Sequence, residues 1–365
     1  MKSKIFNADK SDYESQGLFL GQDQGLLDTV NKKYPDIWRL YKTLKKMDWD
    51  ENEFDYSSCN VEFKTCSPSV YNMMIKTLAW QWEADSVAAR GIAPIMAPFV
   101  SSSELWAAYM EVGKNECVHS FCYSEIVRTS FSNPSEVMAE VLAVQESLQR
   151  LDVVTKVFGE TYKISHEYAL GVHAATEDEV RDQVMLTVCT LLGLERIQFM
   201  SSFAVTFAIC DTGLFNPIGK GVQKIAQEEL EVHVELGKAI LNIELKTKKG
   251  RDSFERIKGK VTEVLNEITN AELNNIKNLF STGDELVGVS EELLSNWALF
   301  NAKDVYKFLK IDSDFTFPKS NPLKFMEKWL DISKTQPSPQ EEDNGQYKLN
   351  SIRKNDDGMV FEVDF

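Results

Sequence analysis

Residues 115–123 of the chain read NECVHSFCY. On an α-helix, Glu116 and His119 lie three residues apart and share one face, and Tyr123 lies one turn further along that face. The stretch thus aims a carboxylate, an imidazole and a phenol at one place. An isolated Glu-x-x-His pair is usually part of a solvated polar stripe, so its meaning depends on whether matching residues recur elsewhere.

Matching acids recur on three other stretches that we expect to form long helices. The acids at positions that should be buried, one on each helix, are Asp85, Glu116, Glu195 and Glu229. Two of the four histidines, His119 and His233, stand close behind two of these acids. Burying one unpaired carboxylate costs several kcal/mol, so four of them need a shared counter-charge. Two divalent cations would supply it.

The ligand types indicate which metal this site would take. Carboxylate oxygens with one imidazole per metal suit iron or manganese better than zinc or copper. Ferritin-like di-iron bundles hold their metals with two single carboxylates and two Glu-x-x-His helices. Asp85 and Glu195 would be the single carboxylates here. We therefore expect two metal ions, most simply two irons, with two manganese ions or a mixed pair as alternatives.

The second acid–histidine pair departs from the Glu-x-x-His spacing, because residues 228–233 read EELEVH. Glu229 and His233 are four residues apart and share a face, whereas Glu231 would face away on a regular helix. A one-residue bulge of the π type, common at functional sites, could change this register. We expect Glu229 to be the ligand and keep Glu231 as the alternative.

Tyr123 would lie beside two redox-active metals. A phenol in that place can lose one electron and persist as a radical if apolar neighbours shield it. The neighbours that we expect around it are Phe199, Phe203 and Ile225. The alternative is an ordinary core tyrosine whose hydroxyl has a hydrogen-bond partner.

The remaining sequence favours a nearly all-α architecture with long helices and little strand signal. We expect an irregular arm at residues 1–30, a helical domain reaching residue 330, and a tail at 331–365. The expected helices cover residues 34–46, 67–90, 101–131, 135–176, 177–210, 221–245, 252–282 and 289–311, with a short helix ending at residue 330. Gly91-Ile92-Ala93-Pro94 is expected to end the second of these.

Composition limits the kinds of binding partner and the cellular compartment that we expect for this protein. The formal net charge of −16 argues against a nucleic-acid surface or an anionic membrane as partner. The most apolar stretch, 184–210, is interrupted by Glu195, Arg196 and Gln198, and so predicts a buried helix rather than a membrane span. The N-terminal residues show no apolar signal region, and no cysteine pair has zinc-ribbon or Cys-x-x-Cys spacing. We expect a cytoplasmic protein with reduced thiols.

The tail has a composition typical of disorder between residues 337 and 345, and it ends in the apolar run MVFEVDF at 359–365. Apolar residues at the end of a polar tether suggest a docking peptide. The alternative is a frayed terminus.

Taken in order, these residues resemble the small (β) subunit of class I ribonucleotide reductase over most of the chain. The resemblance includes Gly21-Gln22, Trp49, Asp85-Ser86, Arg90, Glu116-x-x-His119-Ser120-x-x-Tyr123, Glu195-x-Ile197-x-Phe199, Phe203, Ile225-Ala226-x-Glu228-Glu229, Ser320-Asn321-Pro322, Trp329-Leu330 and Tyr347. One departure is Glu228, which stands where the family usually has an aspartate.

The resemblance implies a ferritin-like homodimer. It implies that one metal is bound by Asp85, Glu116 and His119, and the other by Glu195, Glu229 and His233. Dioxygen would react at the reduced metals and leave a stable radical on Tyr123. The oxidising equivalent would then pass through His119, Glu228 and Trp49, and by Tyr347 in the tail, to a cysteine of the large subunit. That subunit would reduce ribonucleotides to deoxyribonucleotides and would be docked by the C-terminal residues.

Two other functions remain open at this point. A ferritin-like di-iron oxidase or monooxygenase would share the six ligands, but it would need a substrate cavity beside the metals. It would have no use for Trp49, Tyr347 or a docking tail. A non-catalytic metal-binding helical protein would keep its function when Tyr123 is replaced by Phe.

Overall fold

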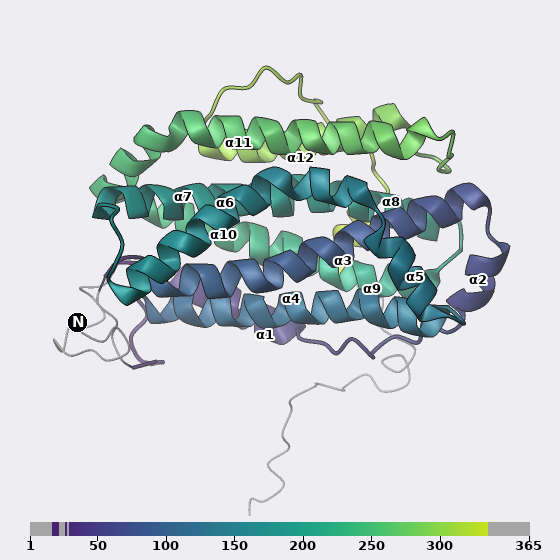
Figure 1. The fold of residues 1–365 in the computed structure, drawn as a ribbon, viewed down its shortest axis with the longest axis horizontal. Coiled ribbons are helices and arrows are strands. Elements are labelled where there is room, and N and C mark those ends of the chain that lie inside the picture. Colours follow the sequence, from purple (N-terminus) through teal and green to yellow (C-terminus); the bar gives the residue numbers. More distant parts are fainter. Residues whose placement is uncertain (1–16, 22–25, 28, 335–365) are drawn as a thin grey trace, which may run out of the picture. The chain divides into compact units, whose positions relative to one another are not determined.

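The computed structural model describes residues 17–21, 26–27 and 29–334, and within these it is built from helices (Figure 1). Two isolated antiparallel bridges, Phe19 with Val100 and Leu286 with Val289, are the β-type pairings in this part of the chain. The prediction of an all-α fold is confirmed. Residues 335–365 lie outside the described residues.

The helices follow one another closely along the chain. In order they are α1 (Pro35–Met47), α2 (Cys59–Thr65), α3 (Pro68–Met96), the 3-10 turn η2 (Ala97–Phe99), α4 (Ser103–Ser130), α5 (Pro134–Leu142), α6 (Gln145–Leu170), α7 (Glu177–Gly193), η3 (Leu194–Phe199), α8 (Met200–Cys210), α9 (Asn216–Glu228), η4 (Glu229–His233), α10 (Val234–Glu244), α11 (Lys248–Ser281), α12 (Glu291–Leu309), α13 (Met326–Leu330) and η5 (Ile332–Lys334). The segments η3 and η4 are π-helical and join their flanking α-helices into two long continuous rods.

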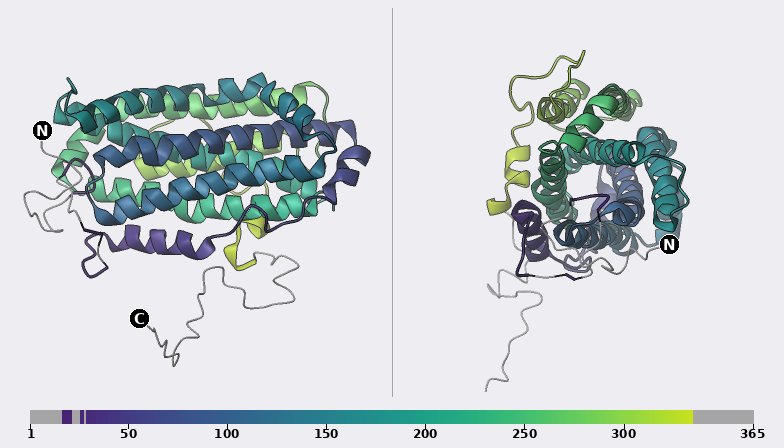
Figure 2. Two further views of the ribbon diagram at one scale, coloured as in Figure 1. Left: turned by 60° about the horizontal axis from the view of Figure 1, so that its bottom comes forward. Right: turned by 90° about the vertical axis from the view of Figure 1, so that its left-hand side faces the viewer.

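Four long rods make the core of the described unit: α3, α4, α7–η3–α8 and α9–η4–α10. Their axes run along roughly one direction, which the end-on panel of Figure 2 shows. Helix α1 packs on α4 and α10, while α6 and α11 pack on the other side, against α3 and α7. The rod Glu177–Cys210 has the length and hydropathy of a membrane span, but its most apolar window is 94% buried in the bundle. It is a core helix, as the sequence predicted.

Helix α3 begins as expected and ends later than expected. The Ser67 hydroxyl accepts a hydrogen bond from the Val70 N–H at 3.3 Å, and Pro68 occupies the first turn. The predicted break at 91–94 is wrong, because the helix contains Pro94 and continues to Met96. A proline this close to the helix end removes a single backbone hydrogen bond. Burial of apolar side chains in the same turn, Ile92, Ile95 and Met96, offsets that loss.

Gly91 does not end the helix, and its lack of a side chain is explained by packing against a neighbouring helix. A Cβ at this position would lie 2.6 Å from the ring of Phe158 on α6. The missing side chain therefore lets α6 approach α3 closely, over the part of the helix that follows Asp85.

Candidate metal centre

The six candidate ligands converge inside the four-rod core. Each is at most 7% exposed, and together they come from all four rods: Asp85 from α3, Glu116 and His119 from α4, Glu195 from η3, and Glu229 and His233 from η4. The structure thus brings together the whole set that the spacing of acids and histidines predicted.

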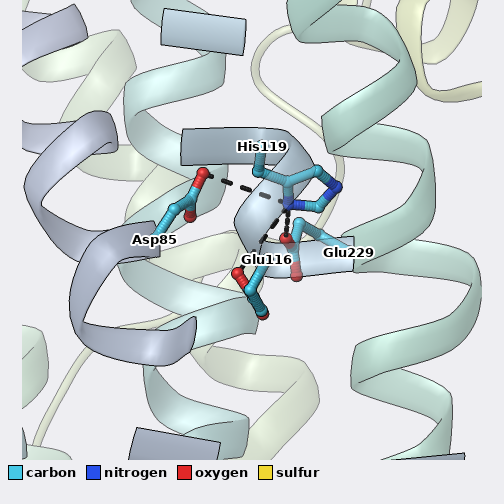
Figure 3. Close-up of side chains that lie close together, drawn as sticks. All are labelled: Asp85, Glu116, His119 and Glu229. Carbon is cyan, nitrogen blue, oxygen red and sulfur yellow. Dashed lines mark ion pairs between the residues drawn. The ribbon is translucent and has the colours of Figure 1, made fainter. Parts of the chain in front are cut away.

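One half of the cluster surrounds the Nδ1 atom of His119 (Figure 3). This nitrogen lies 3.0 Å from Glu229 Oε1 and 3.8 Å from Glu116 Oε2. It lies 4.0 Å from Asp85 Oδ2. Ligand atoms of these four residues all lie within 4.8 Å of one another, a spacing that could hold one metal ion.

The other half surrounds the Nδ1 atom of His233. This atom lies 2.6 Å from Glu229 Oε2 and 3.2 Å from Glu116 Oε1, and Glu195 completes a second group within 4.8 Å. Glu116 and Glu229 belong to both groups. The family resemblance assigned each of them to a single metal, whereas the geometry allows both carboxylates to bridge two ions.

The polar atoms of this cluster fit a dimetal site because they have no other partner. Among the described residues, no group outside the cluster forms a hydrogen bond with the carboxylate oxygens of Asp85, Glu116, Glu195 or Glu229, or with the Nδ1 atoms of His119 and His233. Buried polar groups normally have a hydrogen-bond partner, and leaving one without any costs about 1–3 kcal/mol, more when it is charged. Two divalent cations would satisfy these atoms and balance four negative charges.

The pKa shifts within the cluster also indicate that its buried carboxylates lack counter-charges. Burial raises the pKa of Asp85 and of Glu195, and neighbouring carboxylates raise each further. Burial also acts to raise the pKa of Glu229, but the charges and hydrogen bonds of His233 and His119 outweigh it and lower that pKa. The pKa of both histidines is raised by carboxylates despite burial. Carboxylates and imidazoles must give up their protons to bind a metal, so metal binding would release protons.

The π-helix η4 places Glu229 and Glu231 in different environments. A π-helix has a wider turn than an α-helix, which brings residues four apart closer to alignment and turns the residue midway between them to the opposite side. Glu229 is accordingly fully buried beside His233, whereas Glu231 is exposed to solvent. The placement favours Glu229 as the ligand.

The π-helix η3, which carries Glu195, was not predicted. Its irregular backbone is held from outside by Arg150 on α6, whose Nη2 donates to the Gln198 carbonyl at 2.8 Å. The Arg150 guanidinium is buried, pairs with Glu272 at 2.6 Å and lies 3.5 Å from the centre of the Trp80 ring. A wide helical turn leaves carbonyls to be satisfied elsewhere, and Arg150 satisfies one of them three residues after Glu195.

The second ring nitrogen of His119 faces away from the cluster and contacts Glu228. His119 Nε2 lies 2.8 Å from Glu228 Oε2, and the indole N–H of Trp49 donates to the same oxygen at 2.9 Å. The glutamate that replaces the usual aspartate therefore still joins the histidine to the tryptophan. A buried carboxylate behind a ligand histidine fixes the orientation of the ring.

Asn115 also belongs to this group, and the sequence reasoning missed it. Its side-chain amide donates to Glu228 Oε2 at 3.0 Å, so one oxygen accepts from Asn115 and Trp49 as well as meeting His119. The signal was present in the opening stretch, because Asn115 lies four residues before His119 and shares its helical face.

Tyr123 lies in a dry part of the core. It is 1% exposed, and its hydroxyl has no hydrogen-bond partner among the described residues. Burial, followed by the charge of Asp85, raises its pKa well above the usual value. The three predicted pocket residues, Phe199, Phe203 and Ile225, are fully buried, with the two phenylalanine rings 5.7 Å apart. These apolar, buried surroundings favour an uncharged phenol.

Three predicted features lie wholly or partly outside the described residues. These are Tyr347, nearly all of the tail at 331–365, and most of the arm at 1–30. The tail is described only as far as η5.

Known proteins resemble this chain over most of its length. A family model described as the small chain of ribonucleotide reductase matches residues 27–322. The chain is 22% identical to the ribonucleoside-diphosphate reductase 1 subunit beta of Escherichia coli O157:H7 over 368 residues, 96% of each chain. It is 23% identical over 376 residues to the beta subunit of Buchnera aphidicola subsp. Baizongia pistaciae, 99% of each chain.

Solved structures share the fold. The ribonucleotide reductase R2 subunit from Clostridium botulinum superposes with a TM-score of 0.73 at 14% identity, covering 86% of this chain and 94% of that one. The dimanganese(II)-NrdF of Streptococcus sanguinis gives a TM-score of 0.64 at 15% identity, covering 83% and 98%. The prediction of a ferritin-like helical fold is confirmed.

The family model covers the four rods and every candidate ligand, and the relatives match along nearly the whole chain. The resemblance that the sequence suggested is confirmed. This chain therefore belongs to the small-chain (β-subunit) family of ribonucleotide reductase, and with it to the oxidoreductases.

Proposed function

We propose that this subunit generates a radical on Tyr123 with the help of a dimetal centre and dioxygen, and passes the oxidising equivalent to a large subunit that reduces ribonucleotides. The observation that carries the proposal is the continuous line of contacts from the ligand cluster through His119 and Glu228 to Trp49. A metal store or a structural protein would have no use for such a line.

The centre would hold two metal ions between the six ligands, with iron as the first assignment and manganese or a mixed pair as the alternatives. When bound, the metals supply electrons to dioxygen and so provide the oxidant for the nearby phenol. Glu116 and Glu229 would fix the spacing of the two ions, because each carboxylate reaches both ligand groups. Glu228 would hold the His119 ring with Nδ1 directed at the metals.

Tyr123 would hold the missing electron. Loss of an electron from a phenol releases its O–H proton, and the neighbouring charge that acts most strongly on this hydroxyl is Asp85. The apolar surroundings exclude water and small reductants that would quench the radical.

Replacing Trp49 with Phe tests the line of contacts. The phenylalanine keeps an aromatic ring but loses the indole N–H that donates to Glu228. We expect the radical signal to remain and ribonucleotide reduction with the large subunit to fall by about a hundredfold or more, because the oxidising equivalent can no longer leave the metal centre. Electron paramagnetic resonance and a turnover assay on the same sample measure both. Trp38→Phe on α1 is the control. Equal turnover in the two variants would show that the oxidising equivalent does not pass through Trp49.

The tail would carry the oxidising equivalent onward through Tyr347, which lies outside the described residues. The described residues just before the tail support this role, because they lie beside the helix that carries Glu228. Gln223 and Gln227 on α9, the helix that ends in Glu228, donate to the Trp329 carbonyl at 3.0 and 3.1 Å. The Trp329 ring stacks on Phe207 with centres 4.5 Å apart. The last residues before the tail are thus fixed to α8 and α9.

Tyr347→Phe is expected to leave the radical and the docking of the large subunit intact while turnover stops, since phenylalanine is much harder to oxidise than tyrosine. Turnover, the radical signal and the affinity for the large subunit should be measured together. Tyr162→Phe, at an exposed site on α6, is the matched control. Turnover at the level of the control would contradict a relay through Tyr347.

We also propose a cytoplasmic homodimer, with α4 supplying its interface. Trp106, Met110 and Phe121 share the outward face of α4, opposite the ligand face, and are 38%, 40% and 57% exposed. Large apolar side chains gathered on one exposed face mark an interaction site, and a two-fold axis would pair the face with itself.

Phe121→Asp is expected to shift the full-length protein from dimer to monomer, because it would bury two like charges against each other. Sedimentation velocity measures the change. Val287→Asp places the same charge at an exposed apolar residue away from α4. An unchanged dimer in Phe121→Asp would exclude this face of α4 as the interface.

An oxidase acting on its own organic substrate fits less well. The cavity that reaches Glu195 and His233 has a volume of only about 30 Å³. An organic substrate would need a much larger space beside the ligands.

A further inference from the structure

A small cavity with a mostly apolar lining lies beside the ligand cluster. It lies between α3, α4, α7 and α10, and Glu195 and His233 are among the residues that line it. Its walls are mostly apolar and include Ile92, Val112, Leu192 and Leu236. An apolar space of about 30 Å³ suits a small uncharged molecule and disfavours an ion, which would have to lose its hydration.

The exposure of the ligands points to the same side of the cluster. Asp85 and Glu229 are 0% exposed, whereas Glu195 is 3% and His233 is 7% exposed. The two ligands that line the cavity are therefore the two most accessible. A molecule entering the core through this cavity would meet their side of the cluster first.

Tyr109 adds one polar group to the wall of the cavity. It lies on α4 seven residues before Glu116, and it is 3% exposed. Its hydroxyl has no hydrogen-bond partner among the described residues. A buried hydroxyl without a partner, on a residue that lines a cavity, can offer a hydrogen bond to a small molecule in that space.

Gly237 on α10 keeps the cavity open. It lies within a helix and has no unusual backbone angle, so the backbone does not require a glycine here. A Cβ at this position would meet only Leu192 Cδ1, at 3.9 Å, which is ordinary van der Waals contact. Alanine would fit, whereas a branched side chain of four carbons would occupy the cavity.

We propose that this cavity admits dioxygen and holds it beside Glu195 and His233, with Gly237 leaving the space and Tyr109 supplying a hydrogen bond. Dioxygen is small, uncharged and weakly hydrated, which matches the volume and the apolar lining. The inference rests on the proposed dimetal function and specifies the side from which its gaseous substrate arrives.

Nitric oxide binding to the reduced, iron-loaded full-length protein tests the route without turnover. Nitric oxide is a diatomic gas of similar size, and stopped-flow absorbance measures its rate of association. We expect Gly237→Leu to slow this rate by about tenfold or more, because the leucine must move for each passage. Gly237→Ala should leave the rate unchanged. So should Gly159→Leu, which places the same side chain at an exposed glycine with no atom within 4 Å of its Cβ.

Two further measurements keep the proposal separate from its premise. Iron content per chain is measured for every variant, and an unchanged rate in an iron-replete Gly237→Leu protein would overturn the route. A crystal of the wild-type protein under krypton pressure needs no variant, and apolar cavities take up such gases. Krypton between Leu192 and Gly237 is expected, and an empty cavity there would contradict the proposal. A wild-type protein that takes up no iron would contradict the dimetal function instead, while the krypton map would still decide the cavity.

Discussion

Tyr123→Phe is expected to abolish the radical and reduce ribonucleotide reduction by at least about a thousandfold, with metal content unchanged. Phenylalanine fills nearly the same space in the buried pocket, but it has no O–H bond from which an electron and a proton can be removed. The hydroxyl has no hydrogen-bond partner among the described residues, so its removal leaves no other group unsatisfied. Electron paramagnetic resonance, metal analysis and turnover with the large subunit give the three readouts.

The neighbouring Tyr56→Phe is the matched control, because Tyr56 is also buried and its hydroxyl lies 3.2 Å from the Cys122 thiol. It should keep the radical. A Tyr123→Phe protein that loses its metals would show that Tyr123 is a ligand. A variant that keeps turnover would show that the oxidising equivalent resides elsewhere.

Glu229→Gln is expected to lose metal from both positions, whereas Glu231→Gln should bind the wild-type amount. Glu229 belongs to both ligand groups, and an amide cannot bridge two cations as a carboxylate does. Glu231 is exposed on the opposite side of the same π-helix. Metal per chain, measured after reconstitution with ferrous iron and gel filtration, compares the two.

The pair of variants is balanced, since each removes one negative charge from the same five-residue segment and adds the same amide. Metal loss in Glu231→Gln with retention in Glu229→Gln would reverse the assignment and would require η4 to rearrange when metal binds. Equal retention in both would exclude this segment as a source of the bridging ligand.

The ligand set could be predicted because it breaks a general rule. Acids such as Asp85 and Glu195 stand among apolar residues, where an unpaired charge is not tolerated, so the sequence itself demands a counter-charge. The Glu116–His119 spacing then gave the helical face, and α4 has that face turned inward.

The bridging arrangement could not be read from the sequence. Helical periodicity gives the direction of a side chain within one helix, but the reach of Glu116 and Glu229 to both halves of the cluster depends on how four rods pack. The π-helix η3 was missed for a similar reason. No glycine or proline marks residues 194–199, and the side chain that supports this turn, Arg150, is far away in the sequence.

The error at Pro94 has the opposite cause. A local signal for the end of a helix was given too much weight, and the burial of the surrounding turn overrode it. Asn115 shows that even the opening stretch held more information than its three predicted residues, since its amide completes the hydrogen bonding of Glu228.

The account rests on two cations neutralising a set of buried acids. Anomalous diffraction from crystals of the full-length protein grown with ferrous iron or manganese tests this most directly. We expect two anomalous peaks per chain, both between Glu116 and Glu229, one beside His119 and the other beside His233. A map without peaks in that space, with the six side chains hydrated or turned apart, would contradict the account.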